Sequence, residues 1–126
     1  TRSIAVTGVQ TCALPICFMR PDHLKPSKDV ICTCHGTFHI RDDALHFTVV
    51  MRSNDAVRGM VYDVPWFCHV MQRMKYSLFT TYGHLRIGTY SHFVHSLHLY
   101  DTDVEMARRM LYGPNDLPGA PGVDRA

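Results

Sequence analysis

The segment Met51–Asp55 combines residue types that bind anions. It places Arg52, Ser53 and Asp55 directly after a strand-like run of apolar residues. The planar guanidinium of an arginine can bind two phosphate oxygens at once, and a serine hydroxyl can donate a third hydrogen bond to the same group. The segment is therefore a candidate phosphate site, with a solvated turn after a strand as the alternative.

Cys32 and Cys34 are candidate nucleophiles, placed two residues apart on a predicted strand so that both project from one face. A cation such as Arg52 close to a thiol favours the thiolate, which is the nucleophilic form. A buried, inert thiol is the alternative for each cysteine, because free cysteine packs as a small hydrophobe. Zinc is disfavoured and no metal is expected, since the sequence holds no second ligand pair at finger-like spacing.

The segment Ser96–Tyr100 holds two further hydrogen-bonding side chains. Alternation along a strand places His98 and Tyr100 on one face, where they can present two polar groups to a sugar. A half-buried amphipathic strand is the alternative. The other histidines have no companion motif and are expected to be ordinary packed or surface residues.

The strands that would position these residues follow from the apolar pattern. β-Branched and aromatic residues dominate from Val30 to Ile40 and from Ala44 to Met51, with two turn-forming aspartates at 42–43. This pattern predicts a β-hairpin. Residues 85–99 alternate as a third strand, whereas residues 20–29 hold two prolines and predict a loop.

Two helices complete the predicted elements. Apolar residues at three- and four-residue spacing predict an amphipathic helix over 64–82, with Pro65 in its first turn. A short helix is predicted over 101–111, with Asp101 or Thr102 as its N-cap. The order of strands and helices predicts an α/β or α+β architecture with helices packed on a small, open-edged sheet.

Composition excludes several function classes. The 46% hydrophobic content fits a soluble globular domain, and a formal charge of +2 is too small to favour a nucleic acid polymer. No apolar stretch approaches the roughly 18 residues that a membrane-spanning helix needs, so no membrane partner is expected. Five unevenly spaced cysteines do not suggest a disulfide framework, which predicts a reduced, cytoplasmic protein.

Four pieces of the sequence resemble, in order and spacing, the thymidylate synthase and deoxycytidylate hydroxymethylase superfamily. They are V-I-C-T-C-H (30–35), M-R-S-N-D (51–55), G-M-V-Y-D (59–63) and S-L-H-L-Y (96–100). The resemblance implies a thymidylate synthase-like mixed sheet with packed helices, incomplete here. Residues 17–112 would then be the C-terminal part of the catalytic domain.

The two ends of the chain are predicted to lie outside that domain. The string V-T-G-V-Q-T-C-A-L-P-I (6–16) looks like the translation of a sequencing adapter, so residues 1–16 are predicted to be non-native. Residues 113–126 are rich in proline and glycine and predict a loose tail.

The resemblance implies a role for each matched residue. Cys32 matches the nucleophile that adds to C6 of a pyrimidine, which activates C5 toward the one-carbon unit of 5,10-methylenetetrahydrofolate. Arg52 and Ser53 match the groups that hold the nucleotide 5′-phosphate, and Arg52 also favours the thiolate of Cys32. Asp55 matches a carboxylate that helps to organise the folate side of the site. The pair that hydrogen-bonds the deoxyribose 3′-hydroxyl is matched by His98 and Tyr100.

Asp63 matches the position that recognises the base. Members that act on deoxyuridylate (dUMP) usually carry asparagine there, whereas a carboxylate suits the exocyclic amino donor of cytosine. The resemblance therefore predicts a C5 methyl- or hydroxymethyltransferase acting on deoxycytidylate (dCMP). A dUMP-specific thymidylate synthase is the alternative, and the choice between methyl and hydroxymethyl product stays open.

Two departures from the family pattern support another alternative. The family usually has glycine where this chain has His95, and Leu-Pro where it has Met60-Val61. A histidine in place of glycine can fill space that a ligand needs, which favours a non-catalytic nucleotide-binding homologue. The resemblance also implies a homodimer formed through a sheet face, and it places the general-base carboxylate and the partner-subunit arginines upstream of the nucleophile. The fragment is therefore expected to be inactive alone.

Overall fold

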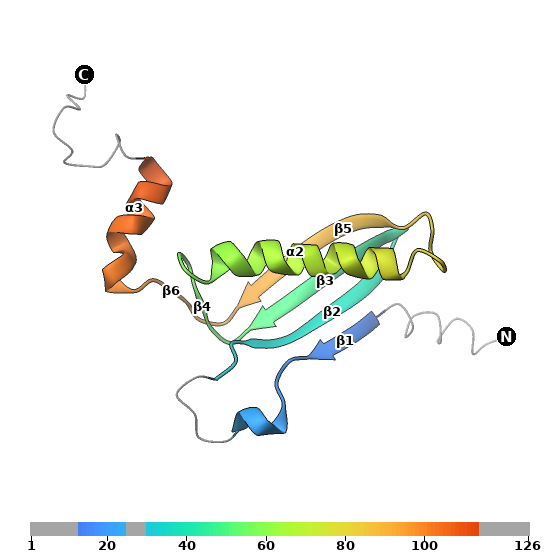
Figure 1. Cartoon of the computed structure of the whole chain (residues 1–126), viewed down its shortest axis with the longest axis horizontal. Coiled ribbons are helices and arrows are strands. Elements are labelled where there is room, and N and C mark those ends of the chain that lie inside the picture. Colours follow the sequence, from blue (N-terminus) through green and yellow to red (C-terminus); the bar gives the residue numbers. More distant parts are fainter. Residues whose placement is uncertain (1–12, 25–29, 114–126) are drawn as a thin grey trace.

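The computed structural model describes residues 13–24 and 30–113, which form a helix-covered sheet and a projecting C-terminal segment (Figure 1). The strands β1, β2, β3 and β5 form a four-stranded sheet in that order, and β4 pairs with β6 in a two-stranded sheet. The elements in chain order are β1 (Ala13–Cys17), η1 (Pro21–Leu24), β2 (Thr33–Arg41), β3 (Ala44–Met51), β4 (Asn54–Asp55), α2 (Met60–Ser77), β5 (Arg86–Val94), β6 (Leu97–His98), η2 (Asp101–Asp103) and α3 (Val104–Tyr112).

The four-stranded sheet is mixed, which confirms the predicted fold class. β1 and β3 both run antiparallel to β2, whereas β5 runs parallel to β3. The parallel pair requires a crossover, and α2 provides it by lying across one face of the sheet (Figure 1).

The predicted β-hairpin is confirmed at the turn between β2 and β3. Arg41 pairs with Ala44, so the loop has two residues, Asp42 and Asp43, with φ of 51° and 56°. A two-residue hairpin turn of type I′ needs positive φ at both positions, and aspartate tolerates this backbone better than most residues. The turn therefore sets the register that brings the two ends of the hairpin together.

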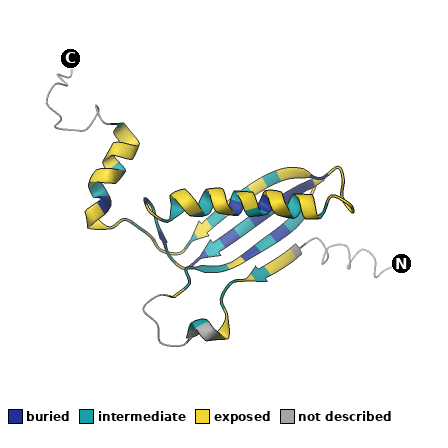
Figure 2. Cartoon of the chain, in the orientation of Figure 1, coloured by how far each residue is buried: buried dark blue, intermediate teal, exposed yellow. Residues whose placement is uncertain are grey.

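The core lies between the sheet and α2. Phe38 and Phe47 stack with ring centroids 3.9 Å apart, and Phe67 of α2 meets Phe47 edge-on at 6.1 Å. Figure 2 shows the buried residues along β2 and β3 beneath the helix, whereas α3 has no buried residue. The core members are Phe38, Leu45, Phe47, Val49, Met51, Phe67, Met71 and Leu85.

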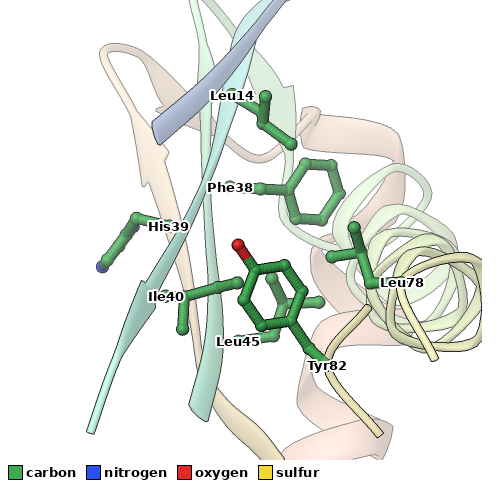
Figure 3. Close-up of a pocket in the computed structure, with 7 residues that line it drawn as sticks. All are labelled: Leu14, Phe38, His39, Ile40, Leu45, Leu78 and Tyr82. Carbon is green, nitrogen blue, oxygen red and sulfur yellow. The ribbon is translucent and has the colours of Figure 1, made fainter. Parts of the chain in front are cut away.

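A small apolar hollow of about 40 Å³ opens between the sheet and the end of α2. In Figure 3, Phe38 and Leu45 extend toward Leu78 and Tyr82 of the helical side, whereas His39 extends from the other side of β2. Alternation along the strand causes this split, so His39 marks the sheet face that α2 does not cover. A hollow of this size is far too small for a nucleotide.

The helix α2 begins four residues before its predicted start at residue 64. The Gly59 carbonyl accepts hydrogen bonds from the backbone N–H groups of Tyr62 and Asp63, both at 2.9 Å, which begins the helix at Met60. Pro65 therefore lies inside α2 and not in its first turn. The earlier start matters for the site because it places Asp63 in the first turn of the helix.

The prediction of one continuous strand over residues 85–99 is wrong, because two separate strands occupy this range. β5 ends at Val94, and the chain then leaves the four-stranded sheet so that β6 can pair with β4. The backbone N–H of His95 still donates to the Met51 carbonyl at 3.0 Å, and the N–H of Asn54 donates to the Ser96 carbonyl at 3.0 Å. The break thus occurs where the partner strand β3 also ends.

The ends of the domain differ from expectation in one respect. β1 was not predicted. Its residues 13–16 belong to the segment that was predicted to be non-native, and the non-native origin of that segment stays a prediction. Residues 1–12, residues 25–29 of the predicted loop and residues 114–126 of the predicted tail lie outside the described residues. In the described part of the chain, no helix combines the length and the apolar character needed to cross a membrane.

Candidate active site

A pocket of about 500 Å³ opens beyond the end of β3, where the segment after β3 faces β6 and the start of α2. Its volume lies within the range of small-molecule sites. Met51, Asn54, Arg58 and Gly59 contribute to its wall. The other candidate nucleophile, Cys34, does not line it. The wall also includes every residue to which the family resemblance gives a role: Cys32, Arg52, Ser53, Asp55, Asp63, His98 and Tyr100.

Backbone hydrogen bonds hold the segments of this wall in register. The N–H of Arg52 donates to the Cys32 carbonyl at 2.9 Å, one residue beyond the regular part of β3. The N–H of Ala56 donates to the His98 carbonyl at 2.9 Å, beside the short parallel pairing of β4 with β6. Side chains from three distant parts of the sequence therefore meet at one end of the sheet.

Cys32 lies just before β2, not on it, and its thiol faces Arg52. The Arg52 Nη2 atom lies 3.7 Å from the Cys32 Sγ atom. The guanidinium also donates through Nε to the Ile31 carbonyl at 3.1 Å and through Nη2 to the Val30 carbonyl at 2.7 Å. The expected adjacency of cation and thiol is therefore present.

The same contacts correct the expected binding mode of Arg52. One edge of its guanidinium is already engaged by the carbonyls of residues 30 and 31, so that edge is not free to grip two phosphate oxygens. A phosphate would have to approach the Nη1 side. The engaged edge instead makes the guanidinium rigid beside the thiol.

Ser53, His98 and Tyr100 form a linked group on the wall. The Ser53 Oγ atom lies 3.4 Å from His98 Nδ1. The His98 and Tyr100 rings meet edge-on, with centroids 5.0 Å apart and an interplanar angle of 82°. The predicted proximity of His98 and Tyr100 is therefore observed, although Tyr100 lies beyond the end of β6.

Asp55 is held from one side by the backbone that follows it. Its Oδ1 accepts hydrogen bonds from the N–H groups of Val57, at 2.8 Å, and Arg58. The Arg58 N–H is the main cause of an Asp55 pKa below its ordinary value, with smaller contributions from Val57, Gly59 and the charge of His98. The second carboxylate oxygen, Oδ2, is buried and has no hydrogen-bond partner.

Asp63 lies in the first turn of α2 and is half buried. This position suits a carboxylate, because the N-terminal end of a helix carries partial positive charge. Burial is the main cause of the raised Tyr90 pKa on β5, with a smaller contribution from the negative charge of Asp63, and the same charge partly opposes the lowering of the His92 pKa by burial. Asp63 therefore lines the pocket and also acts electrostatically on Tyr90 and His92.

The sequence did not reveal a polar group formed by Asn54, His92 and Tyr90. Asn54, only 4% exposed, donates to His92 Nε2 at 3.1 Å, and His92 Nδ1 lies 2.5 Å from the Tyr90 hydroxyl. Burial is the main cause of the lowered His92 pKa and of the raised Tyr90 pKa. Two polar residues spaced two apart on a predicted strand were the available signal for this inward-facing pair.

His95, the departure from the family pattern, does not line the pocket. Its side chain is exposed and meets the Phe93 ring edge-on at 5.2 Å. The expected obstruction of ligand space by His95 is therefore absent from this pocket. Among the described residues, histidine, cysteine and acidic side chains form no group of three or more suited to a metal ion.

Comparison with known proteins agrees with the geometry. No family model matches the sequence. Over 80 residues, 62% of this chain, the sequence is 28% identical to a thymidylate synthase of Symbiobacterium thermophilum, of which it covers 26%. The fold matches thermostable thymidylate synthase A from Bacillus subtilis with a TM-score of 0.59 at 19% identity, covering 82% of this chain and 33% of that one.

The two matches differ in what they support. The match to the solved structure, at its low identity, supports the fold, whereas the sequence match is independent support for the family. The chain spans about a quarter to a third of the length of these relatives. Together with the mixed sheet, the matches support a thymidylate synthase-like superfamily assignment for this partial chain.

Proposed function

We propose that this chain carries the nucleotide side of a one-carbon transferase that methylates or hydroxymethylates C5 of a pyrimidine deoxynucleotide, with dCMP as the preferred substrate. One observation carries the proposal: the Arg52 guanidinium lies 3.7 Å from the Cys32 thiol on the wall of a nucleotide-sized pocket. A cation fixed beside a thiol is the arrangement that activates a cysteine nucleophile.

The chemistry assigned to Cys32 is addition to C6 of the pyrimidine. The thiolate forms a bond to C6, and the electron pair of the C5–C6 double bond makes C5 nucleophilic. When bound, 5,10-methylenetetrahydrofolate supplies the one-carbon unit to which C5 bonds. Loss of the C5 proton would then release the folate nitrogen and leave a methylene group on C5. Addition of a hydride from the tetrahydrofolate, or of hydroxide from water, to that methylene would restore the C5–C6 double bond and expel the thiolate, so Cys32 is regenerated.

The remaining wall residues bind and orient the nucleotide. Ser53 and the free side of the Arg52 guanidinium hold the 5′-phosphate, while His98 and Tyr100 hydrogen-bond the 3′-hydroxyl. The contact between Ser53 and His98 links the two binding groups at 3.4 Å. Phosphate and sugar are therefore held from one continuous side of the pocket.

Asp55 fits a folate at the same pocket. A buried carboxylate oxygen without a donor is energetically costly, and Asp55 Oδ2 is such an atom. The low pKa of Asp55 keeps the group ionised at neutral pH, so Oδ2 acts only as an acceptor. The amide-like N–H and amino groups of a pterin ring are donors of the kind that this atom lacks.

Asp63 supports dCMP as the substrate. A carboxylate accepts a hydrogen bond from the cytosine amino group, but it has no donor for O4 of uracil when it is ionised. A dUMP-specific thymidylate synthase is the alternative, because the relatives in sequence and fold are named as thymidylate synthases.

The test is exchange of the C5 hydrogen of dCMP with solvent, which needs no folate, in this chain with the upstream half of the catalytic domain restored. In D₂O, reversible addition of Cys32 to C6 lets C5 take up deuterium, and loss of the H5 signal in proton NMR measures the rate. Cys32→Ser should slow the exchange by at least about 10³-fold, as expected for removal of a covalent nucleophile. Cys34→Ser is the matched control and should retain exchange.

Protection of Cys32 supplies a second measurement. Bound dCMP should slow the alkylation of Cys32 by iodoacetamide, because the nucleotide covers the thiol. Exchange that survives Cys32→Ser, or a restored protein with Cys32 intact that shows neither exchange nor protection, would overturn the proposal. Protection without exchange would favour a nucleotide-binding homologue without catalysis.

A further inference from the structure

A buried carboxylate links the loop before α2 to the segment that follows Tyr100. Arg58 grips Asp103 with two parallel hydrogen bonds, Nε to Oδ2 at 2.6 Å and Nη2 to Oδ1. The Asp103 side chain is 2% exposed, whereas the Arg58 side chain is 63% exposed. The contact with Asp103 is also the main cause of the raised Arg58 pKa.

This pairing differs from what the sequence indicates for Asp103. A short helix was expected to have a capping side chain at 101 or 102, but the N-cap of α3 is Asp103, and its side chain makes no capping hydrogen bond. Its two oxygens are bound to Arg58 instead. The Asp103 carboxylate therefore makes a tertiary contact with a distant arginine in place of a capping hydrogen bond at the start of α3.

The segment anchored by this contact has little else to hold it. Figure 1 shows the chain leaving the sheet after β5 and carrying α3 away from it, and none of the α3 residues is buried. The contacts back to the body include the two backbone hydrogen bonds from Asn54 and Ala56 to residues 96 and 98. Beyond these bonds, the Arg58–Asp103 pair ties the segment to the loop.

Tyr100 depends on this anchor most directly. Its side chain is 57% exposed, so core packing does not fix it. The backbone N–H of Asp103 donates to the Tyr100 carbonyl at 2.8 Å, which makes the anchored aspartate and Tyr100 parts of one tight turn. The direction in which Tyr100 and its edge-on partner His98 face the pocket therefore follows from where Asp103 is held.

We propose that Arg58 and Asp103 are positioning residues that set the recognition of the nucleotide 3′-hydroxyl by His98 and Tyr100. The inference deepens the proposed function and rests on it. Changing Arg58 leaves the buried Asp103 charge without its partner, and changing Asp103 removes the group that Arg58 binds, so each residue should be required for the arrangement. A bidentate contact also fixes orientation in a way that a point charge does not.

The experiment compares the affinities of the chain for dCMP and for 2′,3′-dideoxycytidine 5′-monophosphate by calorimetry. The two ligands differ in the 3′-hydroxyl alone. In the wild type, dCMP should bind about fivefold to tenfold more tightly, the value of one well-placed hydrogen bond. Asp103→Asn should bring this ratio of affinities to about one, because it weakens the binding of dCMP and leaves the affinity for the dideoxy ligand unchanged. Arg58→Lys should lower the ratio in part.

A matched control removes the other ion pair of the same segment. Arg109 Nε and Glu105 Oε1 lie 3.4 Å apart on the exposed surface of α3, away from the pocket wall. Glu105→Gln should leave the ratio of affinities unchanged. Equal losses for both ligands in Asp103→Asn would overturn the positioning role, because a general structural defect affects both.

Hydrogen exchange of the Ala56 amide gives a readout without ligand. This N–H is bonded to the His98 carbonyl, so loosening of the anchored segment should speed its exchange in Asp103→Asn and in the milder Arg58→Lys. If Asp103→Asn leaves both the Ala56 exchange rate and the 3′-hydroxyl selectivity unchanged, this inference is overturned and the proposed function is unaffected. A wild-type chain that fails to bind dCMP would instead overturn the proposed function and, with it, this inference.

Discussion

At the residue scale, Arg52 performs one task that a lysine cannot. Its guanidinium bonds two backbone carbonyls and still reaches the Cys32 thiol, because the planar group has several donors in fixed directions. A lysine has a single flexible charge and would not hold this geometry. The nucleophilicity of Cys32 should therefore depend on the shape of the cation as well as on its charge.

Replacing Arg52 by lysine tests this dependence. Arg52→Lys should slow the alkylation of Cys32 by iodoacetamide on the order of tenfold at neutral pH, because the thiolate loses its fixed partner. Mass spectrometry of the labelled peptide measures the rate. Arg41→Lys, at the far end of the hairpin, is the control and should have no effect. An unchanged rate in Arg52→Lys would show that the contact does not activate the thiol.

The identity of residue 63 should decide the base. Asp63→Asn supplies both a donor and an acceptor, so the preference should move from dCMP toward dUMP. Removing the mismatch between a carboxylate and uracil O4 is worth about 1–3 kcal/mol, which is roughly tenfold to a hundredfold in relative affinity. Calorimetric titration of both nucleotides measures it, with the exposed Asp101→Asn as control. Equal affinities for both nucleotides in the wild type would remove Asp63 as the base-recognising residue.

At the scale of elements, the loop before α2 is packed against the strand that precedes it. A Cβ atom at Gly59 would lie 2.2 Å from Asn54 Oδ1 and 3.1 Å from the Asp55 carbonyl oxygen. Gly59 thus permits the close approach that lets its carbonyl begin α2, and it brings Asp63 to the pocket. The glycine is required by this contact and not by a positive φ, since its backbone is α-helical.

Gly59→Ala should therefore destabilise the chain by about 1–3 kcal/mol, the usual result of overpacking a tight contact. Urea unfolding followed by circular dichroism measures the free energy. Gly83→Ala is the matched control, because the nearest atom to its Cβ, the Phe79 carbonyl oxygen, is 3.4 Å away. Similar stabilities for the two variants would contradict the packing of Asn54 described here.

The half-buried His92 should make stability depend on pH. Burial lowers its folded-state pKa below the ordinary value of 6.5, although the charge of Asp63 opposes this. The unfolded chain then binds the proton first as the pH falls, so stability is lost below pH 6.5 until the folded pKa is reached. His92→Gln should show a smaller loss between pH 7 and pH 5, measured as the urea midpoint.

The pKa of His39 is also lowered, so the pH dependence of stability requires a separate control at this residue. Burial is the main cause of its lowered pKa, followed by the charges of His46 and Arg41. His39→Gln should remove the His39 part of the pH dependence and leave the His92 part. A midpoint in the wild type that does not fall with pH would contradict both assignments.

The sequence was sufficient for the parts of the fold that local pattern determines. The hairpin turn at 42–43 and the amphipathic stripe of α2 depend on residues near one another in the chain. The seven residues with family-implied roles were found through short motifs at family spacing, and the structure brings all seven to one wall. Their roles stay predictions until ligand binding is measured.

The parts that could not be predicted depend on distant partners. The pairing of β4 with β6 involves two residues on each strand, too few for a periodic signal. Arg58 and Asp103 are 45 positions apart, and nothing in either local sequence indicates the other. The inward orientation of Asn54 toward His92 likewise depends on where β3 and β5 end. Such contacts arise from tertiary packing, which a single sequence does not show.

At the scale of the whole molecule, the described residues leave unusual apolar surface exposed. Trp66 and Phe79 on the helical side and Phe93 on β5 are all more than half exposed. The sheet face opposite α2 also carries the stacked His39 and His46 rings, 5.1 Å apart. Large exposed apolar side chains near an open sheet edge favour association with another protein surface.

The last prediction is that the chain self-associates through the sheet face that α2 leaves open, as the family resemblance implies. Alternation along β5 places Phe93 on this face, because Tyr90 and Val94 pack toward the core. Sedimentation velocity should show a mass that rises with concentration, and Phe93→Ser should lower it. Tyr76→Ser, on the outer surface of α2, is the matched control and should leave the mass unchanged. A monomer at every concentration, or an effect of Tyr76→Ser without one of Phe93→Ser, would exclude this face as the interface.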